Sequence, residues 1–364
     1  MRWLPLVVLA AACGGGSHKA PGDAPLAIDT APPDAPAAGG FVYAVNEGDK
    51  TVSQYKVGGD GTLAAIGTPV ATGAGPYAIA VDRMARYAYV ADHDDNTVAP
   101  FAIGGDGTLT AISPPVAAGE APYALAIDAA AAHLYVADYG TGVQDATVSV
   151  FSIGATGGLT ALGTPLAVGA VASSIAIDRT GAYAYVVNFY NGGTITELAL
   201  SADGTPALNG TFTENTGVTP YVALADPAAD LIYVANDNAN TVSQLGIAQG
   251  GGLAPVATDV PTGTMPQGLA IDPAGAHLYV ANRTSGDIWP YAIAADGSLT
   301  QAGSAIAAGE PCALAVEATG QYLYAIDAGD SAVVQLAIAA DGTIAKVASV
   351  PAGNGPRAIA VARR

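Results

Sequence analysis

The sequence has little cysteine, little positive charge and no helical periodicity. Two cysteines, Cys13 and Cys312, are too few for a disulfide framework in a chain of 364 residues, so a packed core must stabilise the fold. Lys and Arg number 12 against 31 Asp and Glu, and this net charge of −19 excludes nucleic acid as a partner, because little in the chain could neutralise phosphates. No stretch after the N-terminal leader keeps a 3.6-residue apolar period, and Gly and Pro interrupt the chain throughout. These absences indicate an acidic, all-β protein.

A Tyr-centred segment recurs seven times at steps of 45 to 50 residues, at Tyr43, Tyr89, Tyr135, Tyr185, Tyr233, Tyr279 and Tyr324. This period is the length of one four-stranded propeller blade. Most repeats also contain a Pro-led apolar segment before the Tyr segment, a β-branched segment after it, and then an Asp-Gly pair, which favours a hairpin turn. We therefore predict a seven-bladed β-propeller with four-stranded antiparallel blades.

The two chain ends are predicted to complete one blade. The first Tyr segment, residues 41–46, has no Pro-led segment before it, and the last Pro-led segment, residues 356–362, has no Tyr segment after it. Three N-terminal strands and one C-terminal strand would then form the closing blade, which removes free sheet edges. We expect the propeller to span residues 41–364 and the protein to be a monomer.

Residues 1–40 do not fit the repeat. Residues 1–12 have a positive Arg2 and an apolar run too short to span a bilayer, as in a signal peptide. The following Cys13 ends a segment that resembles the lipobox of bacterial lipoproteins, although Leu9 lies four residues before the cysteine and not three. Residues 13–40 are rich in Gly, Pro, Ala and Asp, as in a disordered tether. We expect lipidation of Cys13 and attachment to the cell envelope, on its periplasmic or surface side; the alternative is a secreted protein.

One position in each repeat escapes the repeat pattern. It follows the Pro that opens the Pro-led segment, and we expect it to rim the mouth of the central channel, where propellers commonly bind ligands. The seven residues are Tyr77, Tyr123, Ser173, Tyr221, Gln267, Cys312 and Arg357. Their variation permits a specific site for a small molecule or a protein, but drift between repeats would look the same.

The turns on the same face are rich in carboxylates. The densest group is Asp92, Asp94 and Asp95, which surround His93. Aspartate oxygens suit Ca²⁺, so these residues could bind a calcium ion. Asp is also an ordinary turn residue, which favours a protein that requires no cofactor, with calcium binding as the alternative.

The blade unit P-x-x-(I/L)-A-(V/I)-D, followed by L-Y-V-A-N and N-T-V-S, resembles that of the seven-bladed lactonase propellers and the related YVTN-repeat surface proteins, over residues 41–362. This family includes 6-phosphogluconolactonases and muconate-lactonizing enzymes, which place His, Arg and Glu around the channel mouth. The resemblance implies the same fold and a lactone substrate. A phosphate group would need several Lys or Arg, and this face has few, which disfavours a sugar phosphate.

The family's Pro-Arg and Asn-Glu pairs occur together in the closing blade, as Pro356-Arg357 and Asn46-Glu47. The resemblance implies that Arg357 holds an oxyanion or a carboxylate and that Glu47 acts as general base, with His93 as a further candidate.

Other family residues are missing. The His-Ser pair is replaced by Ser173-Ser174, and the blade that normally carries Arg and Glu has Tyr221 and Asp237. Two functions therefore remain. The incomplete set favours a ligand- or protein-binding scaffold with a degenerate active site, and the alternative is a divergent lactone hydrolase that acts at the channel mouth.

Overall fold

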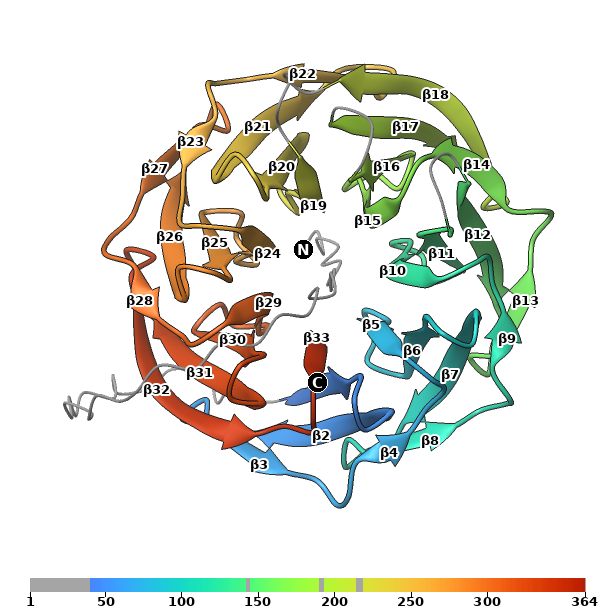
Figure 1. Ribbon diagram of the computed structural model, residues 1–364, viewed down its shortest axis with the longest axis horizontal. Helices are drawn as coiled ribbons and strands as arrows, with labels where there is room; N and C mark the ends of the chain where they lie inside the picture. Colours follow the sequence, from blue (N-terminus) through green and yellow to red (C-terminus); the bar gives the residue numbers. More distant parts are fainter. Residues whose placement is uncertain (1–39, 142–144, 190–192, 214–218, 364) are drawn as a thin grey trace.

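Seven antiparallel sheets surround a central axis (Figure 1). The computed structural model describes residues 40–141, 145–189, 193–213 and 219–363, which contain β-strands and no helix. Among these residues, nothing forms a helix of the length and apolarity that crossing a bilayer requires. The predicted signal peptide and Cys13 lie outside the described residues, as does the predicted tether up to residue 39. The prediction of a seven-bladed all-β propeller is confirmed.

Each blade has four strand positions from the axis outwards. The innermost strands are β33 (Pro356–Arg363), β5 (Pro76–Val81), β10 (Pro122–Ile127), β15 (Ala172–Ile177), β19 (Pro220–Ala225), β24 (Pro266–Ile271) and β29 (Pro311–Val316). The second strands carry the Tyr segments and are β1 (Gly40–Asn46), β6 (Tyr87–Asp92), β11 (His133–Asp138), β16 (Tyr183–Asn188), β20 (Leu231–Asn236), β25 (His277–Asn282) and β30 (Tyr322–Asp327).

The third strands are β2 (Thr51–Val57), β7 (Thr97–Ile103), β12 (Ala146–Ile153), β17 (Thr194–Leu200), β21 (Thr241–Ile247), β26 (Asp287–Ile293) and β31 (Ala332–Ile338). The outer position is one strand in two blades, β18 (Pro206–Thr213) and β32 (Ile344–Pro351). In the others it is a pair of short strands: β3 (Leu63–Ala65) and β4 (Val70–Ala71), β8 (Leu109–Ala111) and β9 (Val116–Ala117), β13 (Leu159–Ala161) and β14 (Leu166–Gly169), β22 (Leu253–Pro255) and β23 (Val260–Pro261), and β27 (Leu299–Gln301) and β28 (Ile306–Ala307). We call the blade of β33 and β1–β4 the closing blade and number the others 2 to 7 in chain order.

The closing blade joins the chain ends as predicted, in the order β3-β2-β1-β33. Strand β33 pairs antiparallel with β1, so that Phe41 lies opposite Ala362 and Ala44 opposite Ile359. The C-terminal strand is therefore the innermost strand of the blade that the N-terminal strands begin.

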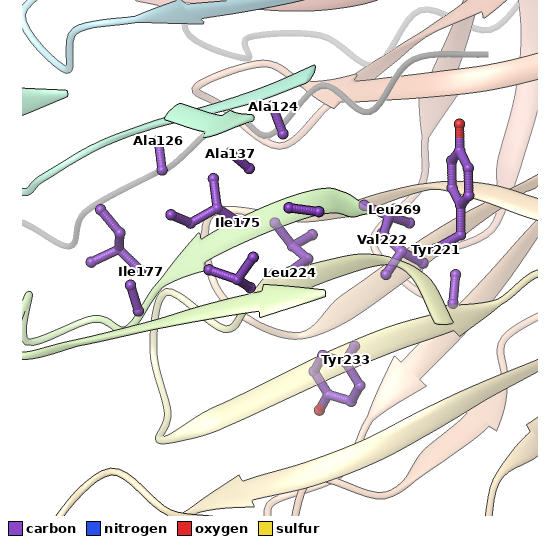
Figure 2. Packing of buried hydrophobic residues seen from close by; sticks show 14 of the residues in the cluster. Ala124, Ala126, Ala137, Ile175, Ile177, Tyr221, Val222, Leu224, Tyr233 and Leu269 are labelled. Atoms are coloured by element: carbon purple, nitrogen blue, oxygen red, sulfur yellow. The ribbon is translucent and has the colours of Figure 1, made fainter. Parts of the chain in front are cut away.

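The core lies between neighbouring blades, where small side chains face large ones. Ala124 and Ala126 of β10 pack in one cluster with Ile175 and Ile177 of β15 (Figure 2). Because the innermost strands converge towards the axis, one face of each interface must be small for the sheets to approach. This requirement explains the alternation of Ala with Ile, Leu or Val along these strands.

The Tyr segments join each blade to the next. The Tyr135 hydroxyl donates a hydrogen bond to the carbonyl of Gly204, in the outer turn of blade 4, at 3.0 Å. Five other tyrosines repeat this bond, namely Tyr43, Tyr89, Tyr185, Tyr233 and Tyr324. His133 packs against the same Gly204, where a Cβ atom would lie 2.4 Å from its ring, so this histidine belongs to the scaffold. The residues that keep the repeat thus hold the ring together.

Candidate functional site at the channel mouth

Every innermost strand contains a β-bulge at one residue. In blade 2, Pro76 lies opposite Asp92 and Ala78 opposite Ala91, so that Tyr77 has no partner in the ladder. The same irregularity occurs in all seven blades. A bulge redirects the side chain of its extra residue. The seven bulged residues are those predicted to rim the mouth, Tyr77, Tyr123, Ser173, Tyr221, Gln267, Cys312 and Arg357, and we call them the rim residues.

A second ring of residues lies beside the first. In each blade, the residue after the Tyr-segment strand donates its backbone N–H to the carbonyl two residues before the bulged residue, at 2.8–3.1 Å. This bond holds the end of the second strand next to the bulge. We call these the exit residues, and they are Glu47, His93, Tyr139, Phe189, Asp237, Arg283 and Ala328.

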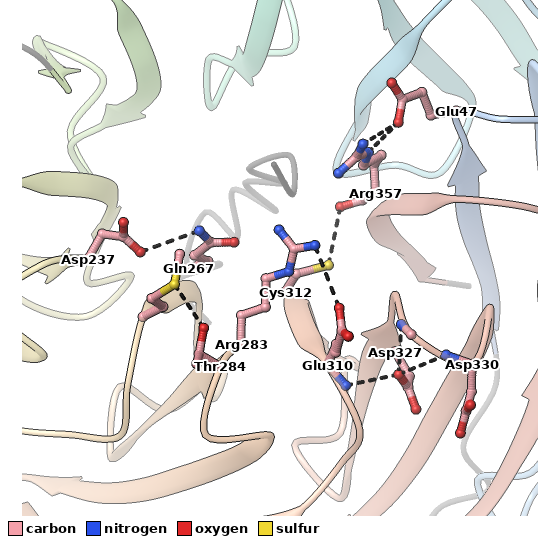
Figure 3. A network of polar contacts seen from close by, with 12 residues as sticks. Glu47, Asp237, Gln267, Arg283, Thr284, Glu310, Cys312, Asp327, Asp330 and Arg357 are labelled. Atoms are coloured by element: carbon pink, nitrogen blue, oxygen red, sulfur yellow. Dashed lines mark hydrogen bonds and ion pairs between the residues drawn. The ribbon is translucent and has the colours of Figure 1, made fainter. Parts of the chain in front are cut away.

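Arg357 and Glu47 form an ion pair at the mouth (Figure 3). Arg357 Nε lies 2.5 Å from Glu47 Oε2, and Nη2 bonds the same oxygen. The arginine Cζ also lies 5.3 Å from the ring centroid of Tyr77, a cation–π contact. Burial raises the pKa of Tyr77, and the neighbouring Glu47 carboxylate raises it further against the opposing charge of Arg357. Ring closure thus brings these two predicted site residues together from opposite ends of the chain.

His93 contacts the ion pair only through Tyr77, which touches both His93 and Arg357. Its ring stacks on Tyr77 with the centroids 4.7 Å apart and an interplanar angle of 26°. Because Arg357 Cζ is 5.3 Å from the same Tyr77 centroid, the His93 centroid and Arg357 Cζ are at most 10.0 Å apart. His93 Nδ1 is 2.9 Å from Asp94 Oδ1, so its hydrogen bond is to a turn carboxylate and not to Glu47.

The three aspartates proposed for calcium do not converge on one point. Asp92 is buried and accepts a hydrogen bond from Thr72 Oγ1, whereas Asp95 accepts one from the backbone N–H of Ala74. Asp94 faces His93. In the parts of the chain that the structure describes, no group of three or more His, Cys, Asp or Glu side chains is arranged to hold a metal ion.

A second polar group spans blades 5 to 7 (Figure 3). The Asp237 side chain is buried, and Gln267 Nε2 lies 3.3 Å from its Oδ1. Burial raises the pKa of Asp237, while the Gln267 hydrogen bond and the nearby Arg283 charge offset part of this rise. Arg283 is also buried, and its Nη2 is 3.6 Å from Glu310 Oε2. Asp237, whose ionised form is disfavoured by burial, therefore lies near Arg283, which is paired with Glu310.

Tyr221 is the rim residue of blade 5. Its hydroxyl is 2.8 Å from that of Tyr123, 98 residues away in the chain. Burial raises the pKa of Tyr221; the charge of Asp237 raises it further, and those of Arg283 and Arg357 lower it. Asp237, Arg283 and Arg357 all stand at the mouth, on blade 5, blade 6 and the closing blade (Figure 3).

Two rim residues are bonded within the ring. Ser173 is fully buried, and its Oγ donates a hydrogen bond to the carbonyl of Tyr221 at 2.8 Å. Cys312 is fully buried too, with Sγ 4.0 Å from the carbonyl oxygen of Arg357. The rim residues thus differ in role: Ser173 and Cys312 are buried and contact the backbone of the neighbouring rim residues Tyr221 and Arg357.

The sequence did not single out Asp237, Arg283, Tyr139 or Phe189 as site residues. Each directly follows the Asn or Asp that ends a Tyr segment, a position that varies as much as the rim position does. This variation is the sequence signal that could have identified the exit residues as site residues. Burial does not distinguish Asp237, because the turn acids Asp92, Asp138 and Asp327 are buried as well.

Comparisons with known proteins agree with this architecture. The family model "Lactonase, 7-bladed beta-propeller" matches residues 34–117, 104–223 and 222–316. Among solved structures, a protein from Lactobacillus plantarum has a TM-score of 0.78 at 18% identity, covering 89% of this chain and 99% of that one. A putative 6-phosphogluconolactonase from Bacteroides fragilis has a TM-score of 0.77 at 18% identity, with coverages of 89% and 98%.

The periplasmic gluconolactonase of Pseudomonas aeruginosa has a TM-score of 0.75 at 17% identity, covering 90% of this chain and 99% of that one. Identities this low establish a common fold. No curated protein matches the sequence.

Proposed function

Because the chain belongs to the family of seven-bladed lactonase propellers, we propose that it hydrolyses a lactone at the channel mouth. One arrangement carries the proposal: the buried Asp237 carboxylate, which is bonded to Gln267, stands at the same mouth as two carboxylate-paired arginines, Arg283 and Arg357 (Figure 3). Membership of this family favours hydrolysis over the non-catalytic scaffold that the incomplete family motif favoured.

Asp237 is the general base in this proposal. Opening a lactone ring requires a group that takes a proton from water as the water oxygen attacks the carbonyl carbon. A carboxylate with a raised pKa is a better base than an ordinary one, and burial raises the pKa of Asp237. Gln267 holds one of its oxygens.

Glu47 takes a positioning role. Its Oε2 accepts two hydrogen bonds from Arg357, so this oxygen is engaged in orienting the guanidinium. Glu47 is the second candidate for the general base, and His93 is the third.

The arginines stabilise the charge that develops. Attack by water places a negative charge on the former carbonyl oxygen, where preorganised donors are most effective. Arg357, held by Glu47, and Arg283, held by Glu310, supply such donors. The ring C–O bond then breaks, and the leaving alkoxide takes the proton from Asp237, giving a hydroxy acid.

The charge of the mouth favours a lactone without phosphate. The two arginines of the described rim and exit residues are each paired with a carboxylate, which leaves little positive charge for a phosphate group. We place the protein in the cell envelope, anchored through Cys13, on the strength of its N-terminal sequence.

A panel of lactones assayed with purified variants tests the proposal. We expect Asp237→Asn to lower kcat by about 10²- to 10⁴-fold with little change in KM. Arg357→Ala should lower kcat/KM by about 10²- to 10³-fold, and Glu47→Gln by less. Asp330→Asn is the matched control, because this exposed carboxylate lies on the same face outside the two rings.

Two results would reject the proposal. One is that the wild-type protein hydrolyses no lactone of the panel. The other is hydrolysis that Asp237→Asn leaves unchanged.

A further inference from the structure

Gln267, the rim residue of blade 6, carries a buried side-chain amide with one bonded end. Its Nε2 donates a hydrogen bond to Asp237 Oδ1 at 3.3 Å. Its Oε1 is buried and has no hydrogen-bond partner among the residues that the structure describes. Figure 3 shows the amide with its nitrogen towards Asp237 and its oxygen turned away from it. The bond to Asp237 thus fixes which end of the amide is the acceptor.

The fold does not require an amide at this position. At the same bulge, blade 4 has Ser173 and blade 7 has Cys312, and both of these smaller side chains contact a neighbouring backbone carbonyl. A buried acceptor that lacks a donor is costly, and such groups are uncommon in folded proteins. A glutamine whose Oε1 has no donor in the scaffold therefore points to a donor that enters the mouth.

One water molecule can bond both Gln267 and Asp237. The oxygen and nitrogen of an amide group lie about 2.3 Å apart, so Gln267 Oε1 is at most about 5.6 Å from Asp237 Oδ1. Two O–H···O hydrogen bonds of about 2.8 Å each span that distance. A water oxygen placed between the two acceptors donates one proton to each of them.

We propose that Gln267 is a positioning residue for the attacking water, whose two protons are directed to Gln267 Oε1 and to the Asp237 carboxylate. This inference rests on the proposed lactone hydrolysis. As the water oxygen bonds to the lactone carbonyl carbon, Asp237 takes one proton, and the proton on Gln267 stays on the new hydroxyl group. The ring C–O bond then breaks, and its oxygen takes the proton from Asp237, which gives the hydroxy acid.

The nitrogen of the same amide has a separate effect. Burial raises the pKa of Asp237, and the Gln267 hydrogen bond and the Arg283 charge lower it. Nε2 therefore affects the pH at which Asp237 ionises, whereas Oε1 affects the rate once Asp237 is ionised. A pH profile separates the two effects, because kcat/KM rises with pH as the base ionises and then reaches a plateau.

Two substitutions of Gln267 test each end of the amide. Gln267→Met removes both ends, so the plateau kcat should fall about 10²-fold at unchanged KM, and the rise of kcat/KM should move to higher pH. Gln267→Glu keeps an oxygen acceptor but loses the donor. Its rise should also move to higher pH, while its plateau kcat stays closer to wild type than that of Gln267→Met.

Gln335→Met is the matched control. Gln335 is a fully buried glutamine of β31, and its Oε1 accepts a hydrogen bond from the backbone N–H of Leu63 at 2.9 Å, in the outer strand β3 of the closing blade. This variant should lose stability but keep the wild-type kcat, KM and pH profile. A loss of plateau kcat as large as that of Gln267→Met would assign both effects to packing and overturn the inference.

Two substrates distinguish a bound water from a hydroxyl group of the substrate. Glucono-1,5-lactone carries hydroxyl groups and δ-valerolactone carries none, yet water attacks both. Gln267→Met should therefore lower the plateau kcat by the same factor for each. A loss confined to glucono-1,5-lactone would overturn the inference and assign Oε1 to a substrate hydroxyl. An unchanged plateau kcat for both lactones would overturn it as well.

A high-resolution crystal structure of the wild-type protein separates this inference from the proposed hydrolysis. We expect an ordered water within hydrogen-bond distance of both Gln267 Oε1 and Asp237, and we expect Gln267→Met to lose it. If this water is found but no lactone is hydrolysed, hydrolysis is rejected and the water site stands. A wild-type structure without a water between the two side chains would overturn the inference.

Discussion

Asp92 and Asp138 are acids at a position where four blades carry asparagine. In those blades the residues are Asn46, Asn188, Asn236 and Asn282. Asn46 Nδ2 donates hydrogen bonds to Thr51 and Ser53, and Asp138 Oδ2 accepts them from Thr147 and Ser149 in the corresponding place. Both acids are fully buried, and burial raises the pKa of each to about 7. They keep the asparagine geometry but add a group that can ionise.

We expect Asp138→Asn to stabilise the protein at pH 8 and to leave it nearly unchanged at pH 4. Since the folded pKa of about 7 lies above the unfolded value, the folded state holds the proton more tightly. The stability from this group is complete below about pH 4 and is lost as the pH rises through 7. The gain at pH 8 is at most about 4 kcal/mol, from about 1.4 kcal/mol per pKa unit.

Chemical denaturation of both proteins at pH 4, 6 and 8 measures this difference. The reverse change, Asn46→Asp, is the matched control, because it should introduce the pH dependence that Asp138→Asn removes. A difference between wild type and Asp138→Asn that does not vary with pH would show that Asp138 is ionised in the folded state.

At the scale of the strand, a Tyr-segment hydroxyl that bonds to the next blade should stabilise the junction between the two blades. Replacing Tyr135 by Phe removes its bond to the Gly204 carbonyl and should cost about 0.5–1.5 kcal/mol of unfolding free energy. Tyr279 offers an internal control, since its buried hydroxyl has no hydrogen-bond partner within the described residues. Urea denaturation should therefore rank Tyr135→Phe below wild type and Tyr279→Phe level with it. Equal losses in the two variants would assign the effect to packing alone.

The strands were predictable from sequence because their signals are local. Alternation, Asp-Gly turns and the Tyr segments lie within one repeat. The same signals located the bulged rim residues, six of which directly follow a Pro, whereas Ser173 follows Ala172. Signals within one repeat could not identify Asp237 and Arg283 as site residues. They lie 46 residues apart, in turns that contain acids in almost every repeat, and they become neighbours only when two blades pack together. Burial and the approach of separate blades are properties of the assembled ring.

At the scale of the whole molecule, closure of the ring also assembles part of the proposed site. Arg357 is on the last strand and Glu47 follows the first, 310 residues away, so the ion pair exists only when β33 pairs with β1. The motif pairs and the predicted closure together were enough to place these two residues.

Deleting residues 355–364 should open the ring and lower the melting temperature by at least several degrees. The deletion removes β33, which pairs with β1 along its length and buries Ala358, Ile359 and Val361 in the interfaces on its two sides. Arg357→Ala in the full-length chain is the control, since it breaks the largely buried ion pair but keeps β33 and its pairing with β1. Calorimetric melting of the three proteins should place the control between wild type and the truncation, with the truncation well below both. If the truncated chain melts at the wild-type temperature, β33 does not contribute to stability, and pairing of the chain ends is not what holds the ring closed.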